Sequence, residues 1–313
     1  MIVLDGNNGI TTPMYNGATA SNQVTPSVNM KNRIINGAMV IDQRNNGSAI
    51  TPVSGAFIVD RWYSSMVAGS GHTANRSTTS TTGFTNSMLI TIGTGGTSTA
   101  AQQAFFEQAI EGYNVSDLAW GTANAKTVTL SFWARSSLTG TYALGFINDN
   151  NDRSYVATYT INSANTFEYK TITIAGCTDG TWVTDNGRGL QLRFGLGAGS
   201  NYQTTAGSWQ NGTYYATSGC ANFIGTSGAT FYIAGVQLEV GSSATSFDYR
   251  PYGTELALCQ RYYRTSFPYG TAPAQNTGVQ QGALVCQSPG TLNNTVAVMV
   301  LVSPTMRANR NTI

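Results

Sequence analysis

The sequence predicts an all-β protein, an antiparallel jelly-roll β-sandwich with an extended N-terminal arm and a small C-terminal β-rich segment. Three observations support this fold class. Charged residues make up only 10% of the 313 residues, so hydroxyl and amide groups must make most of the hydrogen bonds between the surface and water. The chain has 16 tyrosines and 35 glycines, and these residues favour strands and tight turns, respectively. Short runs of alternating apolar and polar residues recur between turn signals.

Residues 1–32 are expected to form the arm. This stretch is polar, is punctuated by Gly and Pro, and keeps neither a period of 2 nor a period of 3.6. A segment of this kind becomes ordered only when a partner supports it. We therefore interpret it as a docking tail, with a disordered terminus as the alternative.

Residues 33–250 carry the strand signals of the sandwich. The clearest alternation lies in 126–135, where Phe132 and its apolar neighbours face one way and Trp133 faces the other. Trp133 is therefore expected either to form a platform on an exposed sheet face or to be covered by another element, and we favour the second. Further strands are expected over 33–44, 57–68, 87–92, 104–110, 141–147, 154–161, 169–176, 190–196 and 229–241.

The last of these runs, 229–241, is interpreted as one long strand. Its residues Tyr232, Ala234, Val236, Leu238 and Val240 are expected on one face, because they follow a period of 2.

Residues 251–313 are expected to form a short helix followed by a small β segment. The run 254–264 has a helical period, with Thr254 as a candidate N-cap. The runs 283–288 and 295–302 are apolar and β-branched, so they are interpreted as strands. A section of this size is too small for a strong core of its own. It should therefore pack on the sandwich or on symmetry mates.

Composition and charge exclude several classes of function. The net charge is +2, and no Lys/Arg-rich block provides the electrostatic footprint of a nucleic-acid-binding protein. No run approaches the 18 or so apolar residues of a membrane span, so no membrane insertion is expected. The first residues lack the basic and apolar regions of a secretory signal, which indicates synthesis in the cytosol.

No metal site and no cofactor are expected. The four cysteines form no CxxC pair, so they are interpreted as free thiols, although a Cys177–Cys220 disulfide stays open. The oxygen-rich stretch 147–154 lacks the glycine and distal glutamate of a Ca²⁺-binding loop. It is interpreted as a hairpin turn.

Catalysis is also disfavoured. The single histidine, His72, lies in a Gly/Ser-rich stretch and is expected to be a solvated loop residue. No serine lies in a GxSxG motif. Glu107 and Glu111 would lie about 13 Å apart on one face of a strand, too far for the carboxylate pair of a glycosidase. The sequence therefore predicts a protein that is not an enzyme.

Aromatic residues that stand among amides in turns are the candidates for glycan contact. A pyranose ring can stack its C–H face on Trp or Tyr, while Asn and Asp bind its hydroxyls. The alternative is that these rings cap the core or fill a subunit interface. The candidate ligand-binding residues are Trp182, Asp185, Tyr202, Trp209, Asn211 and Tyr214.

Four stretches carry a resemblance to a known family. They are NRIINGAMVIDQRNNG, DRWY, EQAIEGYNVSDLAWGTANAKTVTLSFWARSS and AGVQLEVGSSATSFDYRPYGTELALCQRYYR. Together they resemble tail-fibre and minor structural proteins of tailed bacteriophages and prophages, and the similarity covers most of the chain. Residues 100–250 also resemble jelly-roll carbohydrate-binding modules, at the level of fold.

The resemblance implies a structural virion protein, a fibre or spike displayed on the particle and taking part in attachment to host-surface polysaccharide. It also implies a homo-oligomer, a trimer as in most phage fibres, joined to other virion proteins through the N-terminal arm. The particle would be assembled in the host cytoplasm. The alternatives are a capsid decoration or head-fibre protein and a stand-alone carbohydrate-binding adhesion module.

Overall fold

The computed structural model of the protein describes residues 3–5, 9–11, 30–265 and 306–307. The chain divides into two units, Met1–Lys31 and Asn32–Ile313, and each is described by itself. In the first unit, β1 (Val3–Asp5) pairs antiparallel with β2 (Gly9–Thr11). Most of the expected arm over 1–32 lies outside the described residues, so its extended form stays a prediction.

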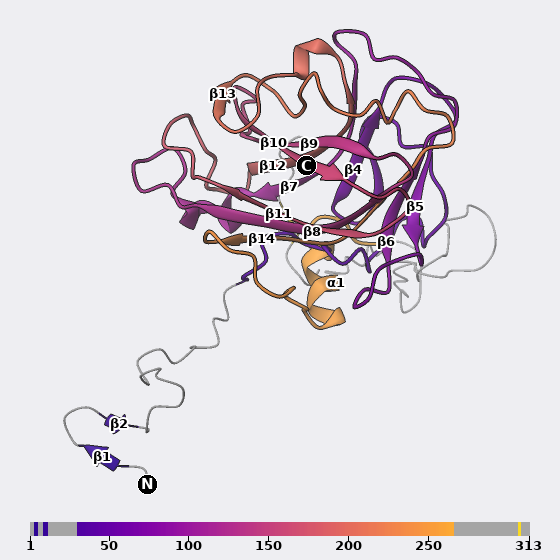
Figure 1. The fold of residues 1–313 in the computed structure, drawn as a ribbon. Coiled ribbons are helices and arrows are strands. Elements are labelled where there is room, and N and C mark those ends of the chain that lie inside the picture. Colours follow the sequence, from indigo (N-terminus) through magenta and orange to yellow (C-terminus); the bar gives the residue numbers. More distant parts are fainter. Residues whose placement is uncertain (1–2, 6–8, 12–29, 266–305, 308–313) are drawn as a thin grey trace, which may run out of the picture. The chain divides into compact units, whose positions relative to one another are not determined.

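The second unit is a sandwich of two antiparallel sheets (Figure 1). One sheet has seven strands in the order β13-β10-β9-β12-β7-β4-β3, and the other has five in the order β11-β8-β14-β6-β5. This confirms the predicted all-β jelly-roll sandwich. The strands are β3 (Ala56–Val59), β4 (Trp62–Met66), β5 (Thr73–Ser77), β6 (Ser87–Thr91), β7 (Gln103–Glu111), β8 (Val128–Ser136), β9 (Gly140–Ile147), β10 (Arg153–Ile161), β11 (Glu168–Ile174), β12 (Arg188–Ala198), β13 (Trp209–Asn211) and β14 (Thr230–Val240).

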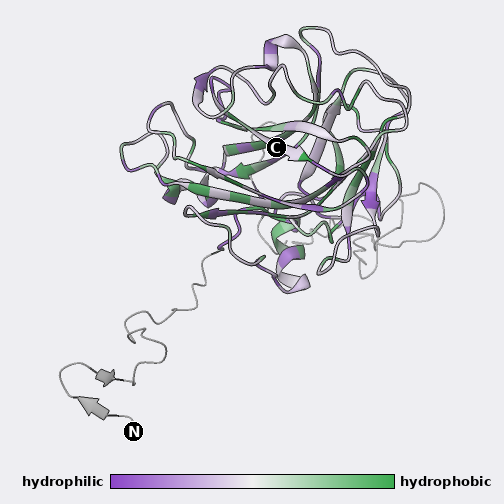
Figure 2. Cartoon of the chain, in the orientation of Figure 1, coloured by the Kyte–Doolittle hydropathy of each residue, from purple (hydrophilic) through white to green (hydrophobic). Residues whose placement is uncertain are grey.

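The core lies between the two sheets and is built by alternation along the strands. In β8, Val128, Leu130 and Phe132 are fully buried, as predicted. Apolar positions recur along the strands of both sheets (Figure 2). Full burial of such a side chain stabilises the fold by roughly 1.5–3 kcal/mol relative to exposure. Alternation therefore identified the inner face of this strand correctly.

The predicted strand over 33–44 does not form. Asn36 and Met39 both have a φ of 58°, in the left-handed region, so the chain turns instead of extending. Gly37 lies so close to β14 that a Cβ on it would be 2.1 Å from the carbonyl oxygen of Val236. Most apolar side chains of the segment are nevertheless buried. The hydrophobic pattern here indicated burial and not strand geometry.

The predicted run 57–68 is two strands and not one. β3 and β4 form an antiparallel hairpin in which Val59 pairs with Trp62. The turn between them is made by Asp60 and Arg61, and Arg61 has a φ of 74°. The two strands extend one edge of the seven-stranded sheet.

The prediction of a single face for β14 is wrong. Its register to β8 shifts between Ala234 and Gln237, where Gly235 has a φ of 60°. This bulge reverses the alternation, because it inserts an extra residue into the strand. Ile233 faces the core before the bulge and Leu238 faces it afterwards, whereas Tyr232 is only half-buried.

The predicted helix is α1 (Tyr252–Gln260), which begins two residues before the expected cap Thr254 and has Pro251 at its N-cap. Its buried residues are Glu255 and Cys259. The Glu255 carboxylate accepts hydrogen bonds from the Asn36 amide and from the Arg250 guanidinium, so the helix packs on the sandwich. The strands expected over 283–288 and 295–302 lie outside the described residues.

Among the residues that the structure describes, no helix combines the length and the apolar character that a bilayer span requires.

Candidate functional site

The candidate site starts at the bulge of β14. Because Gly235 has no side chain, the ring of Phe84 occupies the space beside it. A Cβ on Gly235 would lie only 2.4 Å from the Phe84 ring. The φ of Gly235 is 60°, a backbone conformation that also disfavours any residue other than glycine. The bulge therefore seats Phe84 against the five-stranded sheet.

Phe84 is the centre of a cluster of three rings. Its centroid lies 5.0 Å from that of Phe247 and 5.6 Å from that of Tyr249, and the latter two are 4.8 Å apart. The Tyr249 hydroxyl donates a hydrogen bond of 2.6 Å to the carbonyl oxygen of Gly83. The segment between β14 and α1 is thereby held against the loop that precedes β6.

Two further rings come from neighbouring strands. Trp133 on β8 is directly opposite Tyr169 on β11, and their centroids are 5.3 Å apart. Trp133 is half-buried, so it is neither a free platform nor fully covered. A hollow of about 340 Å³ lies between these rings and the Phe84 cluster. We call it the aromatic hollow and define it by Phe84, Trp133, Tyr169, Gly235, Phe247 and Tyr249.

Two of the rings in the aromatic hollow are exposed, and the other three are half-buried. Tyr169 is 46% exposed and Tyr249 is 60% exposed. A second hollow of about 230 Å³ adjoins it on the other side of Phe84 and Tyr249, and exposed Tyr252 lines this one. Of the four exposed tyrosines among the described residues, only Tyr113 lies outside this surface.

The chemistry of the aromatic hollow is neutral. None of the residues that line it carries a charge, and its polar side-chain groups are the hydroxyls of serine, threonine and tyrosine and the indole N–H of Trp133. A tyrosine is already protonated at neutral pH, so the Tyr249 phenol can donate to Gly83, and partial burial raises its pKa further. The arrangement offers ring faces and hydroxyls to a ligand, and it has no acid or base aimed at one.

The candidates Trp182 and Trp209 form a cluster with Trp120, which we call the tryptophan cluster. The three ring centroids are 4.9–5.5 Å apart, and the rings are nearly perpendicular to each other. Every indole N–H donates to a backbone carbonyl, that of Lys126, Asp179 or Ala175. Trp182 and Trp209 pack against the main core. The geometry matches the alternative in which these rings cap the core.

Asn211 lies near this cluster because it belongs to the same short strand as Trp209. Its side-chain oxygen accepts a hydrogen bond of 2.7 Å from Arg153, which also pairs with Asp179 at 2.6 Å. Asp185 uses Oδ1 to accept a hydrogen bond from the amide of Gly187 in its own loop.

Tyr202 lies elsewhere, whereas the Tyr214 amide donates to the Ser154 hydroxyl on β10, the strand that pairs with β13. Tyr202 packs on Tyr215 with the centroids 5.8 Å apart, beside a small second core that contains Phe105. The Tyr214 ring lies against Gly212, where a Cβ would be 2.7 Å from it. The six candidates therefore do not form one site, and their contact with a glycan stays a prediction.

The expectation for His72 is wrong. The residue is only 4% exposed. Its Nε2 lies 2.7 Å from the carbonyl oxygen of Ala68, and its Nδ1 accepts from the amide of Gly93 at 3.2 Å. The Gly/Ser-rich stretch packs against a second loop, so its histidine is enclosed by backbone groups.

The described cysteines Cys177, Cys220 and Cys259 are free, so no Cys177–Cys220 disulfide forms. Cys286 lies outside the described residues. Over the described ranges, no three His, Cys, Asp or Glu residues gather closely enough to hold a metal ion.

The two glutamates of β7 are each bound to an arginine. Arg193 Nε lies 2.6 Å from Glu107, which also accepts from the Tyr63 hydroxyl. Burial opposes the ionisation of Glu111, but hydrogen bonds from Arg261 and Tyr262 outweigh it and lower its pKa. Both carboxylates thus have structural partners that account for their burial.

Comparison with known proteins gives no family. No family model matches the chain, and no curated protein sequence matches it. Among solved structures, it is similar to the enzymatically active domain of tailspike protein 4 of bacteriophage CBA120, with 16% identity and a TM-score of 0.35 over 64% of this chain. That match spans only 22% of the tailspike chain.

Two sugar-related structures are also similar. A putative sugar-binding protein of Bacteroides thetaiotaomicron has 13% identity and a TM-score of 0.37, covering 67% of this chain and 100% of that one. The family 11 carbohydrate-binding module of Clostridium thermocellum, solved with a mixed-linked tetrasaccharide, has 14% identity and a TM-score of 0.29, covering 62% and 95%. At such scores, the likeness transfers neither a ligand nor a site to this chain.

Proposed function

We propose that this chain is a non-enzymatic glycan-binding protein of a tailed-phage particle, displayed as a fibre or spike, and that the aromatic hollow contacts the glycan. The observation that carries the glycan assignment is the clustering of exposed rings around an uncharged hollow. Two of the four exposed tyrosines among the described residues, Tyr169 and Tyr249, line this hollow. A third, Tyr252, lines the neighbouring hollow, whose lining also includes charged residues.

The class of ligand follows from the lining. A sugar ring presents apolar C–H faces, which pack on aromatic faces, and hydroxyls, which pair with neutral donors and acceptors. A charged ligand would give up hydration in the hollow without gaining a charged partner there. The proposed ligand is therefore a neutral polysaccharide.

A binding assay on the intact chain tests this assignment. Trp133→Ala and Tyr169→Ala each remove one ring, and we expect about tenfold weaker retention on immobilised neutral bacterial polysaccharides, equivalent to about 1.4 kcal/mol. Tyr113→Ala is the matched control, because Tyr113 is also exposed but lies outside the hollow. Equal retention by all three variants and the unaltered protein would contradict the assignment.

An exposed aromatic surface also suits a subunit interface. Light scattering separates the two roles. We expect Trp133→Ala to keep the mass of the unaltered protein, whereas a change to a smaller oligomer would assign the hollow to subunit contact and not to glycan.

The virion part of the proposal is supported by the four stretches that resemble tail-fibre and minor structural proteins. In this proposal the arm over 1–32 docks to the particle and the sandwich is displayed as part of a trimer. The mass of the full chain and of a chain without residues 1–30 should both be near three subunits. A monomer in both cases would favour a capsid decoration protein or a stand-alone adhesion module.

A further inference from the structure

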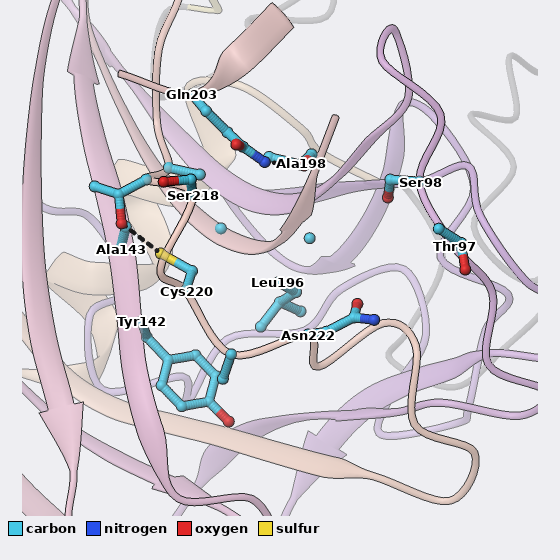
Figure 3. A pocket seen from close by; sticks show the side chains of 15 residues that line it. Thr97, Ser98, Tyr142, Ala143, Leu196, Ala198, Gln203, Ser218, Cys220 and Asn222 are labelled. Atoms are coloured by element: carbon cyan, nitrogen blue, oxygen red, sulfur yellow. Dashed lines mark hydrogen bonds between the residues drawn. The ribbon is translucent and has the colours of Figure 1, made fainter. Parts of the chain in front are cut away.

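Another hollow, of about 230 Å³, is lined by residues near the start of β9, the end of β12 and three loops. Figure 3 shows its side chains. We call it the polar hollow and define it by Ser98, Tyr142, Leu196, Gln203, Ser218 and Asn222. It shares no lining residue with the aromatic hollow. The two hollows are therefore separate.

The polar hollow excludes charged ligands by its lining. None of its residues is Asp, Glu, Lys, Arg or His. An anion or cation entering it would lose hydration without meeting an opposite charge, which is strongly unfavourable. The lining therefore selects a neutral ligand.

Hydroxyl and amide groups around the hollow have capacity for further hydrogen bonds. The hydroxyl of Ser98 is buried and has no hydrogen-bond partner within the described part of the chain. Gln203 donates its amide hydrogen to Ala198 at 2.7 Å, which leaves its carbonyl oxygen available. Figure 3 shows Ser98, Gln203 and Asn222 around the same space. A ligand hydroxyl would supply the hydrogen-bond partner that this buried hydroxyl lacks.

A flat aromatic ligand such as a nucleobase matches the polar hollow less well than a sugar does. Tyr142 is the single ring of the lining, and its hydroxyl is already bonded to Ser136 and to the carbonyl oxygen of Leu138. Because Tyr142 is only 1% exposed, the lining offers hydroxyls and amides and no open ring face, which suits a small saturated ligand that carries hydroxyls on several sides.

The size of the hollow limits the ligand to one unit. Pockets for drug-sized ligands hold roughly 300–1,000 Å³, and this hollow is smaller. It can take one sugar ring, whereas an internal stretch of several rings would not fit.

We propose that the polar hollow binds a single neutral sugar unit, such as the terminal unit of a neutral glycan. The proposal rests on the proposed function for its class of ligand, but it uses a different site. Glycan chains would then meet the protein in two ways, end-on at the polar hollow and side-on at the aromatic hollow.

The test is a titration of the intact chain with glucose, galactose and N-acetylglucosamine, followed by NMR, with glucuronate as the charged comparison. We expect at least one neutral sugar to bind and glucuronate to bind at least tenfold more weakly. Ser218→Trp places a large side chain at the exposed edge of the hollow and should weaken binding at least tenfold. Ser163→Trp puts the same side chain at an exposed serine outside the hollow and should leave binding unchanged.

Ser98→Ala gives a second, milder measurement. It removes only the buried hydroxyl, so binding should weaken by roughly two- to tenfold, as expected for one neutral hydrogen bond. Because that hydroxyl has no partner in the described structure, the variant should fold as well as the unaltered protein.

The outcomes separate this proposal from the proposed function. If no monosaccharide binds while polysaccharide retention persists, the polar-hollow proposal is overturned and the proposed function stands. If a monosaccharide binds and Ser218→Trp abolishes it while no polysaccharide is retained, the aromatic-hollow assignment fails and the polar hollow stands. Undiminished monosaccharide binding in Ser218→Trp would also overturn the polar-hollow proposal.

Discussion

The tryptophan cluster and the aromatic hollow are both rich in aromatic rings, yet they present opposite surfaces to solvent. In the cluster, each indole N–H bonds to a backbone carbonyl and each ring edge meets a neighbouring ring. In the hollow, Tyr169 and Tyr249 leave about half of their surface exposed. An aromatic residue in a polar turn is therefore available to a ligand only when its surroundings leave a ring face open.

The difference has a structural cause. Trp120 is only 7% exposed and packs on Phe146 of the core, so Trp182 and Trp209 complete a cover over the interior. The hollow instead lies outside the five-stranded sheet, where the segment after β14 reaches Phe84 but leaves space before Trp133 and Tyr169.

Trp120→Ala should have the largest effect. It removes the ring that joins the cluster to the core, and the free energy of unfolding should fall by about 4 kcal/mol in urea denaturation. Tyr113→Ala, in the same region of the sequence but exposed, should change it by less than about 0.5 kcal/mol. A loss below about 1 kcal/mol for Trp120→Ala would mean that the cluster does not support the core, and the contrast would break down.

Gly235→Ala should have an intermediate effect and should act on the hollow. The new Cβ meets the Phe84 ring and the φ of 60° adds strain, so stability should fall by about 2 kcal/mol. Polysaccharide retention should also weaken, because the Phe84 cluster forms one wall of the hollow.

Gly228→Ala is the control for backbone strain alone. Gly228 has a φ of +76°, and no atom lies within 4 Å of an added Cβ. The free energy of unfolding of this variant should fall by about 1 kcal/mol, and its polysaccharide retention should be unchanged. Equal behaviour of the two variants would show that Phe84 is not held by the bulge.

The smallest expected effect is that the stability of the tryptophan cluster and that of the aromatic hollow depend on pH in opposite directions. The pKa of the Asp179 carboxyl is lowered, mainly by the hydrogen bond from the Cys177 thiol and next by the charge of Arg153. The backbone carbonyl oxygen of the same residue accepts the hydrogen bond from the Trp182 indole. The stabilising contribution of the Asp179 carboxylate is therefore full above the usual Asp pKa of about 3.9 and is lost as pH falls through the lowered value. Burial raises the pKa of Tyr249, so its contribution is full below about 10 and is lost as pH rises through the raised value.

Acid should thus loosen the tryptophan cluster, and alkali should loosen the hollow. Tryptophan fluorescence followed against pH checks both directions, with Asp179→Asn and Tyr249→Phe as the variants that remove the acid and the alkaline component, respectively. An acid transition that is the same in Asp179→Asn would show that this carboxylate does not support the cluster.

Much of the sandwich could be predicted from the sequence. Alternation placed Val128, Leu130 and Phe132 inside, and the apolar spacing of 87–92 and 190–196 marked β6 and β12. The prediction failed where glycine or a left-handed residue interrupts a run, as at Gly235 in β14 and at Asn36 before β3. A glycine inside an apolar run is itself a known signal of a bulge, so the reversal at Gly235 could have been foreseen.

The candidate site was harder to predict. Trp182 and Trp209 stand among amides in turns, which predicts ligand contact, but their indole N–H groups donate to backbone carbonyls. Tyr169 was missed because it stands in a strand, and Phe84 was missed because nothing near it in the chain marks a site. The only local signal was the aromatic stretch around Tyr249, just before the Pro/Gly boundary that precedes α1.

The amino-acid sequence alone determined the all-β class, the inner faces of most strands and the low charge content of the protein, because alternation and composition can be read without knowing which segments meet. It left open which rings solvent can reach. That exposure was decided by contacts between segments far apart in the chain, such as Phe84 against Gly235 and Tyr249, or Trp120 against Trp182 and Trp209. A ring face stays open only where no distant segment covers it, and no local pattern encodes that.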